Sequence, residues 1–339
     1  MAETVAITDY DFGDVEVERS VIEAAGFRLD ALQCKSEDEL VASAARAAAV
    51  VTQYATVGAK SIANLPRLRH IARYGVGTDI VDVDAAAAAG VLVTNVPADY
   101  CRDEVADHVL AMLLFFARGL RRYDEATHQG TWRWQAAAPL RRLRGSCLGI
   151  VGLGNIGRAI AERALGFGLD VRAHDPYVEA EAARRRHVRL TGLGELLGTS
   201  DYVAVQVPLT EETRGLFNAR TIAQMKRGAV LVNTSRGPIV DSGALYEALA
   251  RGHLAGAAVD DLPEEPAKRR TWTPDNPLFG LSSCIITPHV AYYSEESLRY
   301  ARTFAAREVV RVLRGEPPHS PVNLDRLRPG GRRLPGGGS

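Results

Sequence analysis

The stretch from Leu148 to Asp175 reads LGIVGLGNIGRAIAERALGFGLDVRAHD. It opens with an apolar, β-prone run that ends at Val151 and leads directly into a glycine-rich turn. The following residues, from about Asn155 to Phe167, have the composition of a helix, and a second short strand is expected over Asp170 to Ala173. A strand, a glycine turn, a helix and a second strand in this order predict the first βαβ unit of a parallel, doubly wound sheet.

The glycine turn has the spacing of a dinucleotide site. Gly152 allows a tight turn as the chain leaves the strand, and Gly154 has no Cβ, so the backbone can approach a pyrophosphate. Gly157 lets the helix pack close to the strand. Free N–H groups at the helix N-terminus favour phosphates, and we expect Asn155 and Ile156 to contact the cofactor there as well.

Asp175 indicates which dinucleotide binds. It lies about 20 residues beyond the glycines, where a carboxylate accepts hydrogen bonds from the adenosine ribose hydroxyls. An aspartate there would repel a 2′-phosphate, which favours NAD over NADP. The alternative is a glycine-rich turn in another kind of α/β protein. A second glycine-rich segment, Gly192 to Gly198, has a different spacing and follows a poor strand (Arg189 to Thr191), so we interpret it as a turn and the start of a short helix.

Composition restricts the class of protein. A chain of 339 residues is long enough for two domains. Lysine plus arginine equals aspartate plus glutamate, 41 of each, and the resulting net charge of zero argues against nucleic acid or an anionic membrane as the main partner. No apolar run reaches the roughly 18 residues of a membrane span, and no signal-peptide pattern is present over Met1 to Asp9. We therefore predict a cytoplasmic protein.

The cysteines predict neither a disulfide framework nor a metal site. They are far apart, without a C-x-x-C pair or a Cys/His zinc spacing, and we expect reduced, buried thiols. The four are Cys34, Cys101, Cys147 and Cys284.

Strands and helices alternate along the first hundred residues, which predicts a small parallel sheet of its own. Ser36 is a suitable N-cap for the second helix. The expected strands are Val5–Thr8, Arg28–Leu32, Ala49–Thr52, His70–Tyr74 and Val91–Asn95, and the expected helices are Val17–Ala25, Ser36–Ala48, about Ser61–Leu65 and Val83–Ala89.

A boundary follows at Pro97 to Tyr100, and then a long helix over Asp103 to Ala117. Its apolar residues exceed one helical stripe, so we expect burial on more than one side, either between domains or against a second subunit. Trp132 and Trp134 follow in a loop that would cover the same surface. A homodimer through this helix is therefore predicted.

From Cys147 the chain continues in strand–helix units, with Asn218 and Asp241 as N-caps. Further strands are expected over Tyr202–Val207, Ala229–Asn233, Ala255–Asp260 and Cys284–Thr287, and helices over Ala219–Met225, from Asp241 through Ala250, and Ser294–Leu313. The last helix is expected to return to the first lobe. We predict an α/β protein of two lobes that close on cofactor and substrate: a flavodoxin-like doubly wound substrate domain (residues 1–100 and 292–327), a Rossmann NAD-binding domain (101–291) and a disordered tail (328–339).

Ligands of open α/β sheets bind beyond the carboxyl ends of the strands. The residues that follow predicted strands are therefore candidates: the turn Gly75-Val76-Gly77, Arg236, Glu265 and His289. The alternatives remain open, because most histidines are surface or hydrogen-bonded core residues, and Glu264 and Glu265 also fit a solvated acidic loop.

Taken together, these segments resemble the D-isomer-specific 2-hydroxyacid dehydrogenases. The resemblance covers nearly the whole chain, in the family's order. The matching segments are RYGVGTDIVD (Arg73–Asp82), NVPADY (Asn95–Tyr100), GLGNIG (Gly152–Gly157), VPLTEETRGLFN (Val207–Asn218), LVNTSRGPIVD (Leu231–Asp241), AAVDDLPEEP (Ala257–Pro266) and TPHVAYYSEES (Thr287–Ser297). HDPY (His174–Tyr177) and HVAYYSEE (His289–Glu296) resemble the branch that contains the C-terminal-binding-protein corepressors.

The resemblance implies an NAD-dependent reaction between a 2-oxo acid and a D-2-hydroxy acid. His289 would be the general acid in reduction and the base in oxidation, and Glu265 would fix its tautomer and favour its protonated form. Arg236 would hold the substrate carboxylate with its planar fork of donors, and the N–H groups of Val76 and Gly77 would bind the other side of that carboxylate. Asp260 would contact the nicotinamide end.

The resemblance also implies which residues line the cofactor site and which determine the substrate preference. The residues implied for the cofactor walls are Val207, Pro208, Thr213, Thr234 and Ser235, besides Arg236 and His289. Substrate preference would depend on Tyr54, Arg73 and Tyr292, the last standing where the corepressor branch carries tryptophan. Arg73 would either bind a second anionic group of the substrate or form a salt bridge at the lobe edge. Asp261 replaces a usual apolar residue, which affects local packing.

Other functions are compatible with the same residues. One is an NAD(H)-sensing scaffold that binds protein partners, as the corepressors do. That branch also keeps the residues that correspond to Arg236, Glu265 and His289. Another is a relative that oxidises an unusual donor such as phosphite, but that branch uses a lysine near the glycine turn, where this chain has Arg73.

Overall fold

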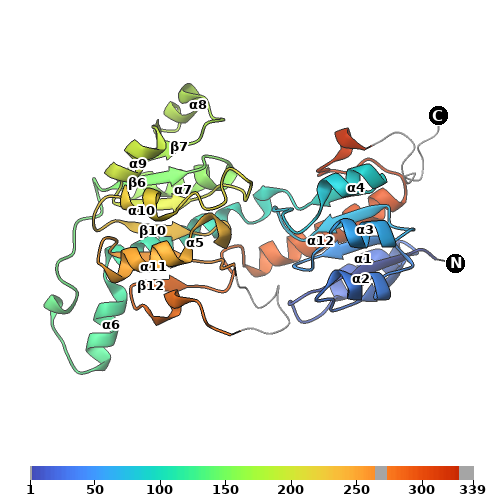
Figure 1. Ribbon diagram of the computed structural model, residues 1–339, viewed down its shortest axis with the longest axis horizontal. Helices are drawn as coiled ribbons and strands as arrows, with labels where there is room; N and C mark the ends of the chain where they lie inside the picture. Colours follow the sequence, from blue (N-terminus) through green and yellow to red (C-terminus); the bar gives the residue numbers. More distant parts are fainter. Residues whose placement is uncertain (1, 264–272, 328–339) are drawn as a thin grey trace. The chain divides into compact units, whose positions relative to one another are not determined.

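The computed structural model describes residues 2–263 and 273–327, and these form two compact units. The first unit contains residues 2–100 and 294–327, and the second contains 101–263 and 273–293. Each unit has its own parallel sheet with flanking helices (Figure 1). The tail beyond residue 327 lies outside the described residues.

The first unit is built on a five-stranded sheet of order β2-β1-β3-β4-β5, with every pairing parallel. This is the flavodoxin-like order, which confirms the predicted fold class. The strands are β1 (Thr4–Ile7), β2 (Arg28–Ala31), β3 (Ala47–Thr52), β4 (His70–Arg73) and β5 (Leu92–Asn95). The helices are α1 (Glu16–Ala24), α2 (Glu37–Ser43), α3 (Ala59–Asn64), α4 (Val83–Ala89) and α12 (Glu295–Leu313), with one-turn helices at η1 (Ala98–Tyr100) and η6 (Leu324–Arg326).

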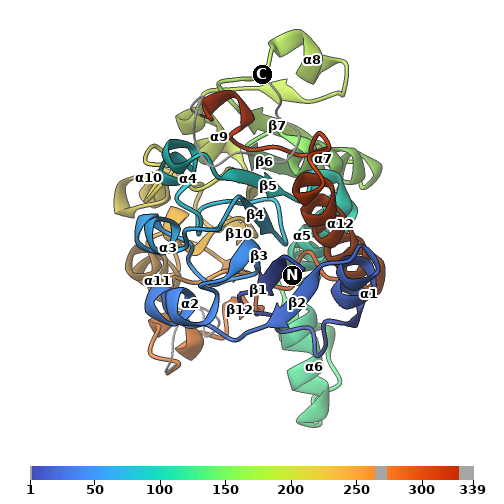
Figure 2. The ribbon, with the colours of Figure 1, turned by 90° about the vertical axis from the view of Figure 1, so that its right-hand side faces the viewer.

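Alternation along the strands gives this sheet two apolar faces. Val50 and Ile71 pack with residues of α2, α3 and α4, whereas Val51 and Ala72 pack with α1 and α12. Figure 2 shows α1 and α12 together on one side of the sheet. The C-terminal helix α12 therefore belongs to the first unit.

The second unit has seven parallel strands in the order β12-β11-β10-β9-β6-β7-β8. Counted from the first strand of the unit this is 3-2-1-4-5-6 with a seventh strand added, the Rossmann order. The strands are β6 (Cys147–Val151), β7 (Asp170–His174), β8 (Arg189–Leu190), β9 (Tyr202–Val205), β10 (Val230–Asn233), β11 (Gly256–Val259) and β12 (Cys284–Ile286). The helices are α5 (Arg102–Ala117), α6 (Leu120–His128), α7 (Asn155–Gly166), α8 (Ala180–Arg184), α9 (Leu193–Thr199), α10 (Ala219–Ala223) and α11 (Ser242–Ala250), with one-turn helices η2 (Trp134–Ala137), η3 (Gly237–Ile239) and η5 (Pro277–Gly280).

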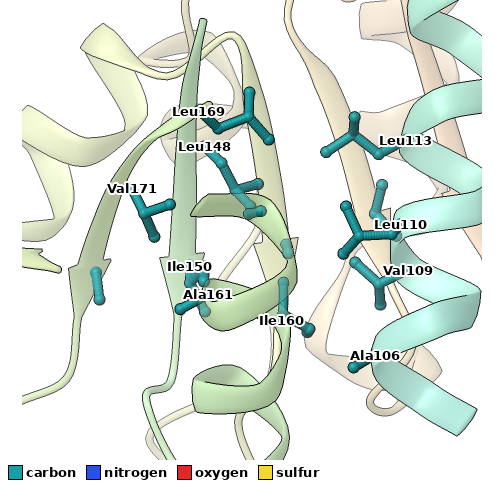
Figure 3. Close-up of a cluster of buried hydrophobic side chains, with 14 of the residues drawn as sticks. Ala106, Val109, Leu110, Leu113, Leu148, Ile150, Ile160, Ala161, Leu169 and Val171 are labelled. Carbon is teal, nitrogen blue, oxygen red and sulfur yellow. The ribbon is translucent and has the colours of Figure 1, made fainter. Parts of the chain in front are cut away.

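Helix α5 is buried on more than one stripe, as predicted. Val109, Leu110 and Leu113 pack with β6 and α7 in one apolar cluster (Figure 3). On its last turn, Phe116 lies over β11, and a Cβ on Gly256 would meet its ring. Since α5 contacts α7 and β10, it completes one face of the Rossmann sheet.

Two expectations about elements were wrong. The helix predicted over Ser36 to Ala48 ends at Ser43, and β3 begins at Ala47. The alanine-rich sequence fits either structure locally, but β3 pairs with β1 and β4 and is buried throughout, so tertiary pairing decides. Within the segment judged a poor strand, Arg189 to Thr191, the first two residues form β8, because β7 offers them a partner. Helices α6 and α8 were not anticipated.

Several local predictions are confirmed. Ser36, Asn218 and Asp241 each accept a hydrogen bond from the first turn of the helix that they precede. All four cysteines are free and buried.

In the part of the chain that the structure describes, no helix has both the length and the apolar character that crossing a bilayer requires.

Candidate active site

The glycine turn between β6 and α7 lies where the strand order of the Rossmann sheet reverses. Gly152 has φ +98°, a conformation that L side chains rarely adopt, and a Cβ there would collide with the carbonyl oxygen of Gln206. A Cβ on Gly157 would collide with the carbonyl oxygen of Gly152. Gly154 differs, because a Cβ there would have no protein atom within 4 Å. The turn is therefore closely packed at Gly152 and Gly157 and open at Gly154.

The open position at Gly154 fits a pyrophosphate. Gly154 is the N-cap of α7 and has no side chain that could cap the helix, and helix N-termini of this kind bind anions. Asn155 and Gly154 are exposed, and Ile156 is half-buried. The residues of this turn thus fit the phosphates of a dinucleotide.

Asp175 is fixed beside the same turn. It follows β7, and its two carboxylate oxygens accept hydrogen bonds from the N–H groups of Leu153 (2.8 Å) and Tyr177 (2.9 Å). The N–H of Gly152 donates to the carbonyl of His174 (2.9 Å), which closes the turn against β7. A carboxylate offers about four lone-pair sites, so two remain for ribose hydroxyls.

The next wall is formed by the loops after β9 and β10. The hydroxyl of Thr213 donates to the carbonyl of Pro208 (2.6 Å), and the amide of Gln206 donates to the hydroxyl of Thr234 (2.7 Å). Ser235 donates from its hydroxyl to the carbonyl of Val205 (2.6 Å). These bonds fix both loops at the carboxyl edge of the sheet, which is the predicted position of the cofactor. Val207 follows β9 in the same loop, half-buried.

Arg236 is held in an extended conformation just before η3. The buried amide of Asn233 donates to its carbonyl (3.0 Å), and one guanidinium nitrogen donates to the carbonyl of Ser235 (2.8 Å). Gly237 follows, and a Cβ on it would lie 2.6 Å from backbone atoms of Leu262 and Pro263. The loops after β10 and β11 are therefore in direct backbone contact.

His289 stands on a loop held by one buried carboxylate. Asp260, after β11, accepts hydrogen bonds from the hydroxyl of Thr287, from Val290 N–H (2.9 Å) and from Ala291 N–H (2.8 Å). The N–H of His289 donates to the carbonyl of Asp260 (2.6 Å), and its φ is +56°. A non-glycine residue in the left-handed region is uncommon and concentrates at functional sites.

Among the described residues, Asp261 and Tyr292 both lie beside the imidazole of His289. Asp261 places a carboxylate oxygen 3.8 Å from Nδ1 and is only 2% exposed. Tyr292 meets the ring edge-on, with centroids 6.3 Å apart. On the far side of the loop, Nε2 of His108 lies 3.2 Å from the hydroxyl of Thr287. Glu265, the carboxylate expected beside His289, lies outside the described residues.

The candidates of the first unit lie at the carboxyl ends of β3 and β4. Asp9, which the sequence analysis missed, accepts hydrogen bonds from the N–H groups of Gln53 (3.1 Å) and Tyr54 (2.7 Å) and so fixes the Tyr54 loop. Arg73 ends β4 at 8% exposure, with its guanidinium against Gly75. A buried acid directly after a strand was the signal available for Asp9.

The Gly75-Val76-Gly77 turn presents backbone next to Arg73. Val76 is exposed, Gly77 is half-buried, and the carbonyl of Val76 accepts a hydrogen bond from the amide of Asn95 (2.7 Å). The structure therefore places four candidates on one sheet edge of the first unit, namely Tyr54, Arg73, Val76 and Gly77. The described candidates of the second unit lie along the carboxyl edge of the other sheet.

The fold and the glycine turn define a dinucleotide-binding oxidoreductase domain, and comparison with known proteins agrees. Residues 110–291 match the family described as D-isomer specific 2-hydroxyacid dehydrogenase, NAD binding domain. The chain belongs to the D-isomer-specific 2-hydroxyacid dehydrogenase family, with NAD as the cofactor of its second unit.

The similar proteins are named for different substrates. The D-3-phosphoglycerate dehydrogenase of Mycobacterium tuberculosis is 38% identical over 288 residues, which are 85% of this chain and 53% of that protein. The chain thus spans about half the length of such relatives. The glyoxylate reductase of Korarchaeum cryptofilum is 38% identical over 78% of this chain and 80% of its own. The D-lactate dehydrogenase of Aquifex aeolicus, solved with NAD and lactic acid, superposes with a TM-score of 0.84 at 30% identity, covering 92% of this chain and 96% of that one.

Proposed function

We propose that this protein is an NAD-dependent oxidoreductase that interconverts a 2-oxo acid and a D-2-hydroxy acid by hydride transfer. The observation that carries the proposal is the common position of the open glycine turn, Arg236 and His289 on the carboxyl edge of one Rossmann sheet. That edge is where ligands of such sheets bind. His289 is also held in a rare backbone conformation, which favours a functional role over a surface one.

Different residues would bind the cofactor and transfer the proton. Gly152, Gly154, Gly157 and Asp175 would hold the dinucleotide, whose nicotinamide supplies the hydride when bound. His289 would give a proton to the substrate oxygen in reduction and take it back in oxidation. In this scheme the remaining members of the proposed cofactor site are Asn155, Ile156, Val207, Pro208, Thr213, Thr234, Ser235 and Asp260.

The substrate would be bound through its charged carboxylate. Arg236 would pair with the 2-oxo acid's carboxylate, since a guanidinium matches a carboxylate with two parallel donors. The N–H groups of Val76 and Gly77 would complete that site. Glu265 would orient the imidazole of His289, as the family resemblance implies.

Specificity would depend on Tyr54, Arg73 and Tyr292. Arg73 is nearly buried at a strand end, and we propose that it binds a second anionic group where the substrate carries one. A phosphate or a second carboxylate would satisfy it. The aromatic ring of Tyr292 stands against His289, and so it would contact the substrate close to the reacting carbon.

NADH oxidation tests the function. We would follow NADH absorbance with a panel of 2-oxo acids whose side chains are small, branched, aromatic or phosphate-bearing, using His289→Ala as the control. Turnover of one member that is lost in the variant is the expected result. Arg73→Leu should then raise KM for doubly anionic members more than for singly charged ones.

The alternative is an NAD(H)-sensing scaffold of corepressor type. His174–Tyr177 and His289–Glu296 resemble the corepressor branch, and Tyr177 and Tyr293 are exposed, as residues of a protein-binding surface would be. Tight NADH binding without turnover on any panel member would favour it.

We infer that the protein forms a homodimer in the cytoplasm. Trp132 and Trp134 are 88% and 71% exposed, which is unusual for tryptophan unless a partner covers it. In the same unit, Phe115, Phe116 and Leu140 line a pocket of about 480 Å³ that a second copy's tryptophan would fill. Light scattering tests this: we expect a dimer, and a monomer for the double variant Trp132→Ala, Trp134→Ala. A monomeric parent protein would refute the inference.

A further inference from the structure

Two successive carbonyl groups of the turn that follows β4 are held by the end of β5. The N–H of Val96 donates to the carbonyl of Gly75 (3.2 Å). The side-chain amide of Asn95 donates to the carbonyl of Val76 (2.7 Å). Both peptides of the turn are trans and planar, so that each N–H lies opposite its carbonyl. The N–H groups of these two peptides, those of Val76 and Gly77, therefore point away from β5.

The side-chain amide of Asn95 is itself fixed in one orientation. A carbonyl oxygen only accepts hydrogen bonds, so the amide nitrogen faces Val76 and the amide oxygen faces the other way. The hydroxyl of Ser320 donates to that oxygen (2.8 Å), and the carbonyl of Ser320 accepts from the N–H of Asn95 (3.2 Å). The N–H of Ser320 donates in turn to the buried carboxylate of Glu308 on α12 (3.2 Å). The segment after α12 therefore fixes the side chain that orients the turn.

Gly77 makes this support necessary. The peptide between Val76 and Gly77 can rotate to the opposite orientation if the residue after it adopts a positive φ, as in the interchange of type I and type II turns. Glycine adopts positive φ at no steric cost. The rotated peptide would present the carbonyl oxygen of Val76 where its N–H group now points, and a carbonyl oxygen offers a carboxylate no donor. The hydrogen bond from Asn95 opposes that rotation.

We propose that Asn95 is a positioning residue for the substrate carboxylate. It holds the Val76–Gly77 peptide with its N–H group toward the carboxylate and its carbonyl oxygen away from it, and Ser320 supports Asn95 in this task. The inference rests on the proposed function, which assigns the N–H groups of Val76 and Gly77 to that carboxylate. Asn95 itself does not touch the substrate.

NMR can observe this peptide directly. Protein isotope-labelled at the valine carbonyl carbons and the glycine nitrogens gives carbonyl–nitrogen correlations only from valine–glycine peptides. The sequence contains three of these, namely Val57–Gly58, Val76–Gly77 and Val151–Gly152. The first precedes α3 and serves as an internal reference, and the last belongs to the proposed cofactor turn. The signal of Val76–Gly77 is assigned by its loss in Gly77→Ala.

The test uses the intact chain and matched variants. Asn95→Ala removes the donor, and Asn95→Asp replaces it with an oxygen atom in the same place. Asn323→Ala is the control, because Asn323 binds the opposite end of β5: its amide donates to the carbonyl of Val91 (3.0 Å) and accepts from the N–H of Val93 (2.8 Å). Ser320→Ala removes only one hydroxyl group, and it keeps the inference testable if both Asn95 variants fail to fold.

Both Asn95 variants should move the Val76–Gly77 signal and leave the other two signals in place. Oxamate has the carboxylate of a 2-oxo acid but accepts no hydride, and with NADH bound it should move the same signal in the parent protein. It should bind the variants about 10- to 100-fold more weakly, the usual effect of losing one hydrogen bond to a charged group.

The kinetic expectation follows from the same contact. For the substrate found above, KM should rise by the same factor while kcat stays within about threefold, because the carboxylate is bound equally before and during hydride transfer. Ser320→Ala should act in the same direction by about 3- to 10-fold, as for a hydrogen bond between neutral groups. Asn323→Ala should leave KM, oxamate affinity and the Val76–Gly77 signal unchanged, and NADH affinity should be the same in all variants.

The NMR signals need no turnover, so the two proposals can fail separately. A Val76–Gly77 signal that stays in place in the Asn95 variants, or that oxamate does not move in the parent protein, would overturn the role of Asn95. An equal rise of KM in Asn323→Ala, or a moved signal with unchanged oxamate affinity, would make Asn95 a structural residue only, against the proposal. A protein that binds oxamate at this turn through Asn95 but reduces no 2-oxo acid would overturn the proposed function and support the inference.

Discussion

Replacing Gly154 by alanine should separate cofactor binding from folding. A Cβ at this position would have no protein atom within 4 Å, and the residue's φ of −70° is ordinary for alanine. The free energy of unfolding should therefore change by no more than about 0.5–1 kcal/mol. The new methyl group would occupy the space through which the backbone approaches the pyrophosphate. An overpacked contact costs about 1–3 kcal/mol, so NADH should bind about 10- to 100-fold more weakly.

Gly157→Ala is the matched comparison. Its Cβ would strike the carbonyl oxygen of Gly152, so the cost should fall on stability, by about 1–3 kcal/mol. Urea unfolding and NADH fluorescence titration measure the two quantities on the same samples. If Gly154→Ala binds NADH as tightly as the parent protein, the pyrophosphate does not lie on this turn, and the reasoning fails.

Two further predictions concern charge. Asp175→Ala removes the carboxylate that would repel a 2′-phosphate, so the ratio of kcat/KM for NADPH to that for NADH should rise at least about tenfold, and an unchanged ratio would show that Asp175 does not select the cofactor. Burial lowers the pKa of His70, on β4, to about 3, whereas the unfolded chain protonates this residue near pH 6.5. Stability from this neutral histidine is complete above pH 6.5 and is lost toward pH 3, by about 1.4 kcal/mol per pH unit; urea unfolding from pH 7 to pH 5 should show this slope reduced in His70→Gln, and equal slopes would contradict the assignment.

Sequence reasoning was most successful where the signal is local. The glycine spacing located the turn between β6 and α7, and Ser36, Asn218 and Asp241 were identified as caps because capping depends on a few neighbouring residues. The alternation of strands and helices was sufficient to predict two parallel sheets. These features follow from short-range steric and hydrogen-bonding preferences.

The sequence was less informative where distant segments decide the structure. The alanine-rich run before β3 fits a helix until β1 and β4 supply partners, and it then becomes a buried strand. The task of Asp9 depends on the loop after β3, 43–45 residues away in sequence. Asp261 suggested only altered packing, since its distance from His289 exists only once β11 and β12 are paired.

The two loop-anchoring acids, Asp9 and Asp260, have a consequence for how such proteins diversify. Each carboxylate binds two backbone N–H groups of the loop that it anchors, those of Gln53 and Tyr54 in one unit and of Val290 and Ala291 in the other. Every residue except proline offers that N–H. The side chains at these four positions are therefore exchangeable without loss of the backbone anchor, and a new substrate preference can arise by point substitution on a loop whose path over the sheet edge stays the same.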